Sequence, residues 1–93
     1  MANPQHVTLT ANTVATVTLD AGAHLVEVLN VDGAAAVYFT IDRSTPTVGG
    51  NGCHVVPGAI GHLELPPAAA GDAISVVKLI STGTPKVSVR AIS

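Results

Sequence analysis

The sequence predicts an all-β fold, a single small β-sandwich or barrel of about eight mostly antiparallel strands. Three observations predict it. The 93 residues include 14 Val, 5 Ile and 10 Thr, and β-branched side chains fit a pleated sheet better than a helix. No part of the chain keeps the spacing of every third or fourth apolar residue that marks a helix, whereas short apolar alternations recur. Each alternation ends at Gly, Pro, Asn or Asp, which favour turns.

The N-terminal half is expected to form four strands. Ala15, Val17 and Leu19 alternate with Thr, so one face of their strand should be buried. Asp32-Gly33 is the strongest turn signal, because this pair tolerates positive φ, and it predicts a hairpin between the third and fourth strands. Phe39 is expected to be the aromatic residue of the core. These strands are expected over 7–10, 13–19, 24–30 and 36–42.

The C-terminal half is expected to supply four more strands after a long loop. Residues 43–52 concentrate Pro, Gly, Ser and Asn, which predicts an exposed loop of a length at which loops are often functional. The seventh strand has apolar residues on both faces, as expected near the centre of a sheet. A turn at 82–85 should lead it into an up-and-down pair with the last strand. These strands are expected over 53–56, 61–65, 73–81 and 86–92.

Length and cysteine content indicate one domain held by packing alone. A chain of 93 residues has room for a single core. We expect one β-sandwich domain over 7–93 and a flexible N-terminal arm over 1–6, where no strand or cap signal occurs. Cys53 is the single cysteine, so an internal disulfide is excluded.

Charge is the most unusual feature of the composition. Only 11% of residues are charged and the net charge is −2, whereas about 25% is typical of soluble domains. Such a surface favours association over repulsion, which predicts an oligomer or a docked subunit. Four basic residues are too few to neutralise nucleic-acid phosphates. Neither a membrane span nor a secretion signal is expected from the hydropathy pattern.

A zinc site is the first chemical possibility to weigh. Cys53, His54, His62 and Glu64 offer suitable ligand atoms, and His54 and His62 would lie side by side if Pro57-Gly58 formed a hairpin. However, Cys53 and His54 should point to opposite faces of a strand, so only part of the set can converge. We therefore expect no metal site and solvent-facing histidines.

Catalytic and cofactor sites are not predicted either. No Gly-x-Ser-x-Gly elbow occurs, and most carboxylates sit at predicted turns, where Asp stabilises the backbone locally. The glycine-rich stretch 49–52 lacks the helix and lysine of a phosphate-binding loop. Glycan stacking usually needs exposed aromatics, and the chain has no Trp and only Tyr38. Partner contact is the remaining role, and the residues expected to make it are Tyr38, Arg43, Thr45, Pro46, Thr47, Val48 and Asn51.

Five segments carry a resemblance to a known class of proteins. They read VEVLNVDG at 26–33, VYFTID at 37–42, PTVGG at 46–50, VP at 56–57 and VVKLISTGTP at 76–85. Over residues 25–89 the chain resembles small virion proteins of tailed bacteriophages, especially those of actinobacterial hosts.

The resemblance implies a non-enzymatic structural protein of the virion, synthesised in the host cytoplasm and without cofactors. Its expected role is that of a capsid decoration or minor capsid protein that docks on the head exterior and reinforces the shell. The expected partners are the major capsid protein and copies of itself, as a homotrimer, with no nucleic acid and no membrane. The alternatives are a tail- or collar-associated module and a module that binds a host-surface glycan through residues 43–52.

Overall fold

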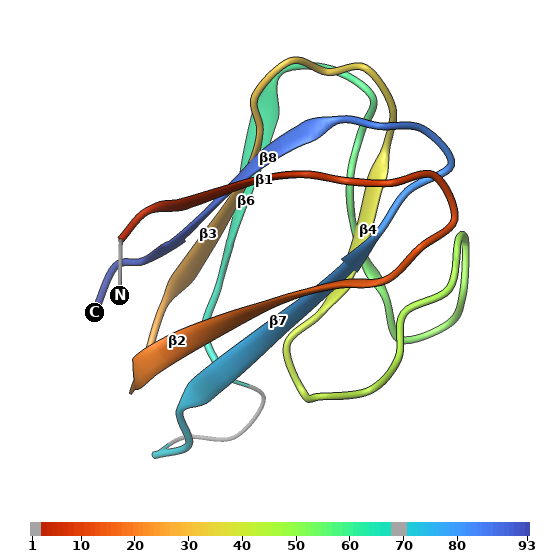
Figure 1. The fold of residues 1–93 in the computed structure, drawn as a ribbon. Helices are drawn as coiled ribbons and strands as arrows, with labels where there is room; N and C mark the ends of the chain where they lie inside the picture. Colours follow the sequence, from red (N-terminus) through yellow and green to blue (C-terminus); the bar gives the residue numbers. More distant parts are fainter. Residues whose placement is uncertain (1–2, 68–70) are drawn as a thin grey trace.

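Two antiparallel sheets, each of four strands, make up the computed structural model, which describes residues 3–67 and 71–93 (Figure 1). One sheet has the strand order β1-β8-β3-β6 and the other β2-β7-β4-β5. The all-β prediction is therefore confirmed. The strands are β1 (Gln5–Thr8), β2 (Ala15–Ala23), β3 (Val26–Asn30), β4 (Val37–Thr40), β5 (His54–Val56), β6 (Gly61–Leu65), β7 (Ile74–Ile80) and β8 (Lys86–Ala91).

The strands pair from the ends of the chain inward, the first with the last and the second with the next to last. β1 pairs with β8, β2 with β7, β3 with β6 and β4 with β5, and the two sheets are completed by β3–β8 and β4–β7. This is the arrangement of one long antiparallel hairpin wound into two sheets, the jelly roll. The chain passes from one sheet to the other at six of the seven connections between the described strands.

Two expected hairpins are wrong. Gly33 has a φ of +66° and forms a turn with Asp32, but β3 and β4 lie in different sheets and do not pair. The last two strands, β7 and β8, are likewise in different sheets. Residue alternation fixes which face of a strand is buried, but it does not say which strand lies beside it.

The core lies between the two sheets. Phe39 is fully buried there, as predicted, among valines such as Val28, Val37, Val77 and Val89. β7 is an inner strand and is largely buried on both faces, which agrees with its apolar sequence. All buried side-chain polar atoms of the described residues have hydrogen-bond partners.

Buried Asn30 joins two of the connections between the sheets. Its Nδ2 donates to the carbonyl oxygens of Ala35 (2.8 Å) and Pro57 (3.0 Å), and its Oδ1 accepts from the Gly33 amide (3.0 Å). A Cβ atom at Gly33 would lie 2.9 Å from the Ala59 backbone, so only glycine fits this close approach. The β3–β4 and β5–β6 connections are therefore locked against each other.

The predicted N-terminal arm over 1–6 needs correction. β1 starts at Gln5, which is opposite Val89 in β8. Asn3 also exchanges two hydrogen bonds of 2.9 Å with the backbone of Ala91. Residues 3–6 are thus part of the sandwich, and the remainder of the expected arm, residues 1–2, lies outside the described residues.

Candidate functional site

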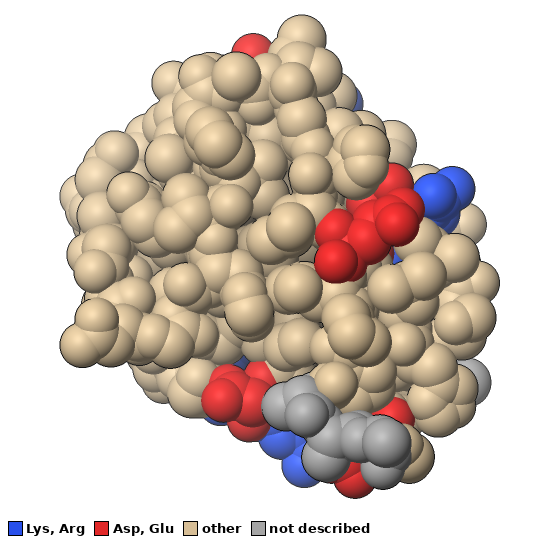
Figure 2. Space-filling view, turned by 180° about the vertical axis from the view of Figure 1, so that it is seen from behind, with Lys and Arg blue, Asp and Glu red and all other residues tan. Residues whose placement is uncertain are grey.

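The longest stretch without charge becomes one side of the molecule. No Lys, Arg, Asp or Glu occurs between Arg43 and Glu64, and residues 44–63 form most of the β4–β5 loop, β5, the β5–β6 connection and the start of β6. We call the exposed residues of 44–63 the uncharged surface. The β4–β5 loop projects on the right in Figure 1, and the corresponding left half of Figure 2, seen from behind, is largely free of charged side chains.

Large apolar side chains are exposed on the uncharged surface. Val48, Val55 and Ile60 are 39%, 45% and 75% exposed, and they are three of the five large hydrophobic side chains exposed in the described residues. Val55 lies on β5, which is an edge strand. Exposed apolar area favours contact with a partner where it forms a continuous patch.

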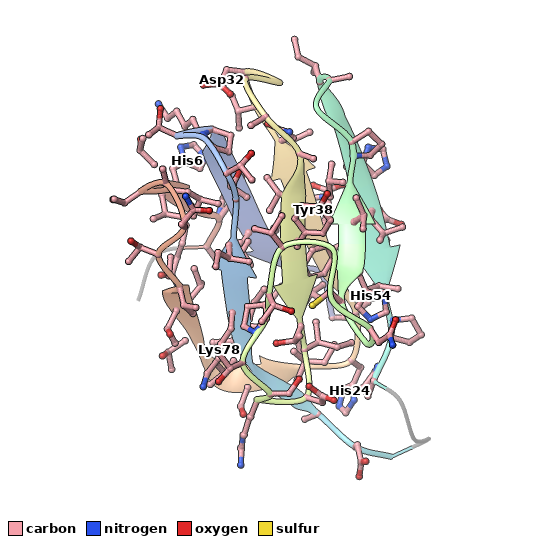
Figure 3. All side chains as sticks on the ribbon, turned by 90° about the vertical axis from the view of Figure 1, so that its right-hand side faces the viewer. His6, His24, Asp32, Tyr38, His54 and Lys78 are labelled. Atoms are coloured by element: carbon pink, nitrogen blue, oxygen red, sulfur yellow. The ribbon has the colours of Figure 1, made fainter. Side chains whose placement is uncertain are left out.

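The β4–β5 loop is ordered by its own hydrogen bonds. Thr40 Oγ1 donates to the Ser44 carbonyl (2.6 Å), and the Gly50 amide donates to the Thr47 carbonyl (3.0 Å). The thiol of Cys53 lies 3.6 Å from the same Thr47 oxygen. Figure 3 shows the loop folded over the outer face of the β2-β7-β4-β5 sheet, where it helps to bury Thr40.

The residues predicted for partner contact divide into two groups. Thr45, Thr47, Val48 and Asn51 are exposed on the β4–β5 loop, as a contact role requires. Pro46 is buried within the same loop, so its side chain supports the loop and is not presented to a partner.

Arg43 and Tyr38 lie at the margin of this surface. The Arg43 Nη2 donates to Ser75 Oγ on β7 (2.7 Å), so its guanidinium is held against β7. Tyr38 is half-buried and lies between Val55 and Ile80 in the strand register. Val55 and Ile60 were not among the predicted contact residues, although the run of twenty residues without charge is visible in the sequence.

The four ligands weighed for zinc do not come together. β5 and β6 belong to different sheets, so Pro57-Gly58 does not form a hairpin between them and His54 and His62 are not cross-strand neighbours. The His54 ring instead lies 5.4 Å from the Phe39 ring. His62 and Glu64 approach Glu27 of β3, the one cluster of metal-ligating residue types found in the described part of the chain.

A shallow depression of about 360 Å³ lies beside the uncharged surface, and Asp42, Arg43, Asp72 and Ser75 are among its lining residues. A hydrogen bond from the Ser44 hydroxyl, followed by one from the Ser44 amide, lowers the pKa of Asp42 below its usual value of 3.8. This is the local turn chemistry that the sequence predicts for most of the carboxylates.

Asp32 behaves in the same way as Asp42. Its carboxylate accepts from the amide of Ala34 two residues on (3.1 Å) and from the amide of Lys86 (3.2 Å). The two aspartates therefore stabilise connections between strands.

The fold and the surface define the chain as a small jelly-roll β-sandwich with one uncharged side. No family model matches it, and neither a curated protein nor a solved structure matches it significantly. The described residues contain no helix long and apolar enough to cross a bilayer.

Proposed function

We propose that this chain is a non-enzymatic structural protein of a tailed-phage virion, a capsid decoration or minor capsid protein that docks on the outside of the head. The observation that carries the proposal is the uncharged surface, which exposes Val48, Val55 and Ile60 on one side of a small sandwich. The phage-like segments of the sequence support it. So does the strand order, because jelly rolls occur in viral capsid domains.

Oligomerisation fits the size of the surface. Docking of a single copy must overcome about 4–15 kcal/mol of lost translational and rotational freedom. Three exposed apolar side chains return only a part of this, at about 25 cal/mol for each Å² of apolar area buried. A trimer presents the surface three times in one encounter, so modest contacts combine into stable binding.

Two other functions use the same surface. A tail or collar module would dock through the same apolar residues, and only its location on the particle distinguishes it. A glycan-binding module is less well supported, because Tyr38 is half-buried and is the only Tyr in a chain without Trp. Jelly rolls nevertheless occur in lectins as well, so glycan binding belongs in the test.

The test compares phage particles with and without this protein. Particles that lack it should assemble but release their DNA at a lower temperature, and purified protein added back should restore their heat resistance. Gold-labelled antibody should decorate the head. Unchanged heat resistance with label on the tail alone would instead assign the protein to the tail or collar. A specific signal on a glycan array, without binding to heads, would replace the proposal with glycan recognition.

A further inference from the structure

A second cluster of functional groups lies on the outer face of the β1-β8-β3-β6 sheet, away from the β4–β5 loop. It consists of Glu27 on β3 and of His62 and Glu64 on β6. One ligand atom from each side chain lies within 4.8 Å of the other two. Oxygen and nitrogen donors from two hydrogen-bonded strands therefore gather at one place on the sheet.

The strand register explains this convergence. Glu27 is directly opposite Glu64 in the β3–β6 pair, and His62 lies two residues from Glu64 on the same face of β6. Like charges directly opposite each other destabilise a strand pair. Arg90 of β8 forms an ion pair with Glu27, in which its Nη2 lies 3.5 Å from Glu27 Oε1. Among the described residues, Glu64 forms no ion pair.

We propose that Glu27, His62 and Glu64 bind a divalent transition-metal ion, with Zn²⁺ as the best match. Two carboxylates and one imidazole suit zinc, which accepts both kinds of donor, whereas Ca²⁺ and Mg²⁺ prefer six or more oxygen ligands. Three protein ligands leave one tetrahedral position for water or for a donor from a neighbouring molecule. Arg90 is placed to orient Glu27, as residues behind metal ligands commonly do.

Metal binding would strengthen the edge of the sheet. β6 is the edge strand, held in this sheet by β3 alone. An ion bound by ligands from both strands replaces the repulsion between Glu27 and Glu64 with attraction to a shared cation. This site does not rest on the proposed virion function, because it needs no partner and has only His62 in common with the uncharged surface.

Titration of the metal-free protein with ZnCl₂ by calorimetry tests the site. We expect one Zn²⁺ per chain, and at least tenfold weaker binding in His62→Gln and Glu64→Gln. His6→Gln is the matched control, because His6 is exposed on β1 of the same sheet and lies outside the cluster. Its affinity should equal that of the wild type. Cys53→Ser is the second control and should also bind normally.

Thermal unfolding is a second measurement, and it distinguishes a loss of metal binding from a loss of stability in the variant. Without metal, Glu64→Gln should unfold at a temperature equal to or above that of the wild type, because it removes one of two opposed charges. A hundredfold excess of Zn²⁺ over its dissociation constant should raise the wild-type Tm by roughly 10 °C and leave Glu64→Gln unchanged. The proposal is overturned if Zn²⁺ does not raise the wild-type Tm, or if Cys53→Ser loses binding while His62→Gln keeps it.

Discussion

The uncharged surface and the outer face of the β1-β8-β3-β6 sheet differ in their content of charged side chains. The first has no charged residue in twenty consecutive positions, and its long loop is held by hydrogen bonds from backbone and neutral side chains. The second carries Arg90, Glu27 and Glu64 in one row across three adjacent strands. The chain has only ten charged residues, and they are distributed unevenly, so that one side of the molecule carries none of them.

This difference suggests separate roles for the two regions. An uncharged side with exposed valine and isoleucine can be covered by another protein without burying an unpaired charge, which would be costly. A row of opposed carboxylates, in contrast, is suited to a small cation.

Asn30→Ala should have the largest effect, because Asn30 links β3 of the β1-β8-β3-β6 sheet to Pro57 of the uncharged surface. The substitution leaves two carbonyl oxygens and one amide without a buried partner. We expect a loss of about 3 kcal/mol in the free energy of unfolding, measured by urea denaturation. Asn51→Ala, in the exposed loop, should stay within about 0.5 kcal/mol of the wild type. Equal losses in the two variants would show that this link does not matter.

Ile60→Asp and Val55→Asp test the uncharged surface directly. Each places a charge where a partner would cover the chain, so binding to phage heads should weaken at least tenfold, or about 1.4 kcal/mol. Val14→Asp is the matched control, because Val14 is also exposed (36%) but lies outside residues 44–63. Circular dichroism should show all three variants folded. Equal weakening by Val14→Asp would remove the distinction between the two sides.

Arg90→Gln tests the charged row in the metal-free protein. Without the guanidinium, Glu27 and Glu64 oppose each other with no cation beside them, and we expect a loss of about 0.5–1 kcal/mol. The double variant Arg90→Gln/Glu64→Gln should recover most of this loss in the same urea experiment. A double-mutant cycle with zero coupling would mean that the row acts as three independent charges.

Asp42, at the edge of the uncharged surface, should show the smallest effect. Because hydrogen bonds from Ser44 lower its pKa in the folded chain, its contribution to stability is present above 3.8 and is lost as the pH falls through the lower, folded value. NMR titration should find a midpoint below 3.8, and Ser44→Ala should move it upward. An unchanged midpoint in Ser44→Ala would exclude the hydroxyl as the cause.

The sequence predicted the strands well and their neighbours poorly. All eight expected strands occur within a few residues of their predicted bounds, because alternation is local and turn residues mark the ends. The pairing of β3 with β6 spans more than thirty residues, and nothing in either strand identifies its partner. For this reason Glu27 was not associated with His62 and Glu64, and the Asp32-Gly33 turn was assigned to a hairpin.

The exposure of the residues predicted for partner contact was predictable in part. Composition alone identifies the loop and hence Thr45, Thr47, Val48 and Asn51, which are exposed. It does not reveal that Pro46 is buried within the same loop, since that depends on how the loop folds over the β2-β7-β4-β5 sheet. The exposure of Ile60 depends in turn on the tight connection beside Gly33, which brings two distant turns into contact.

The winding of the chain between the sheets has a consequence for folding kinetics. β4 and β5 are the only successive strands that pair among those described, and the loop between them is long. Short hairpins therefore cannot nucleate the sandwich, and distant segments must meet before either layer gains stability. Such topologies fold in about milliseconds to seconds. Each sheet contains strands from both halves of the sequence. We therefore expect the two sheets to unfold together when a protease cuts one connection.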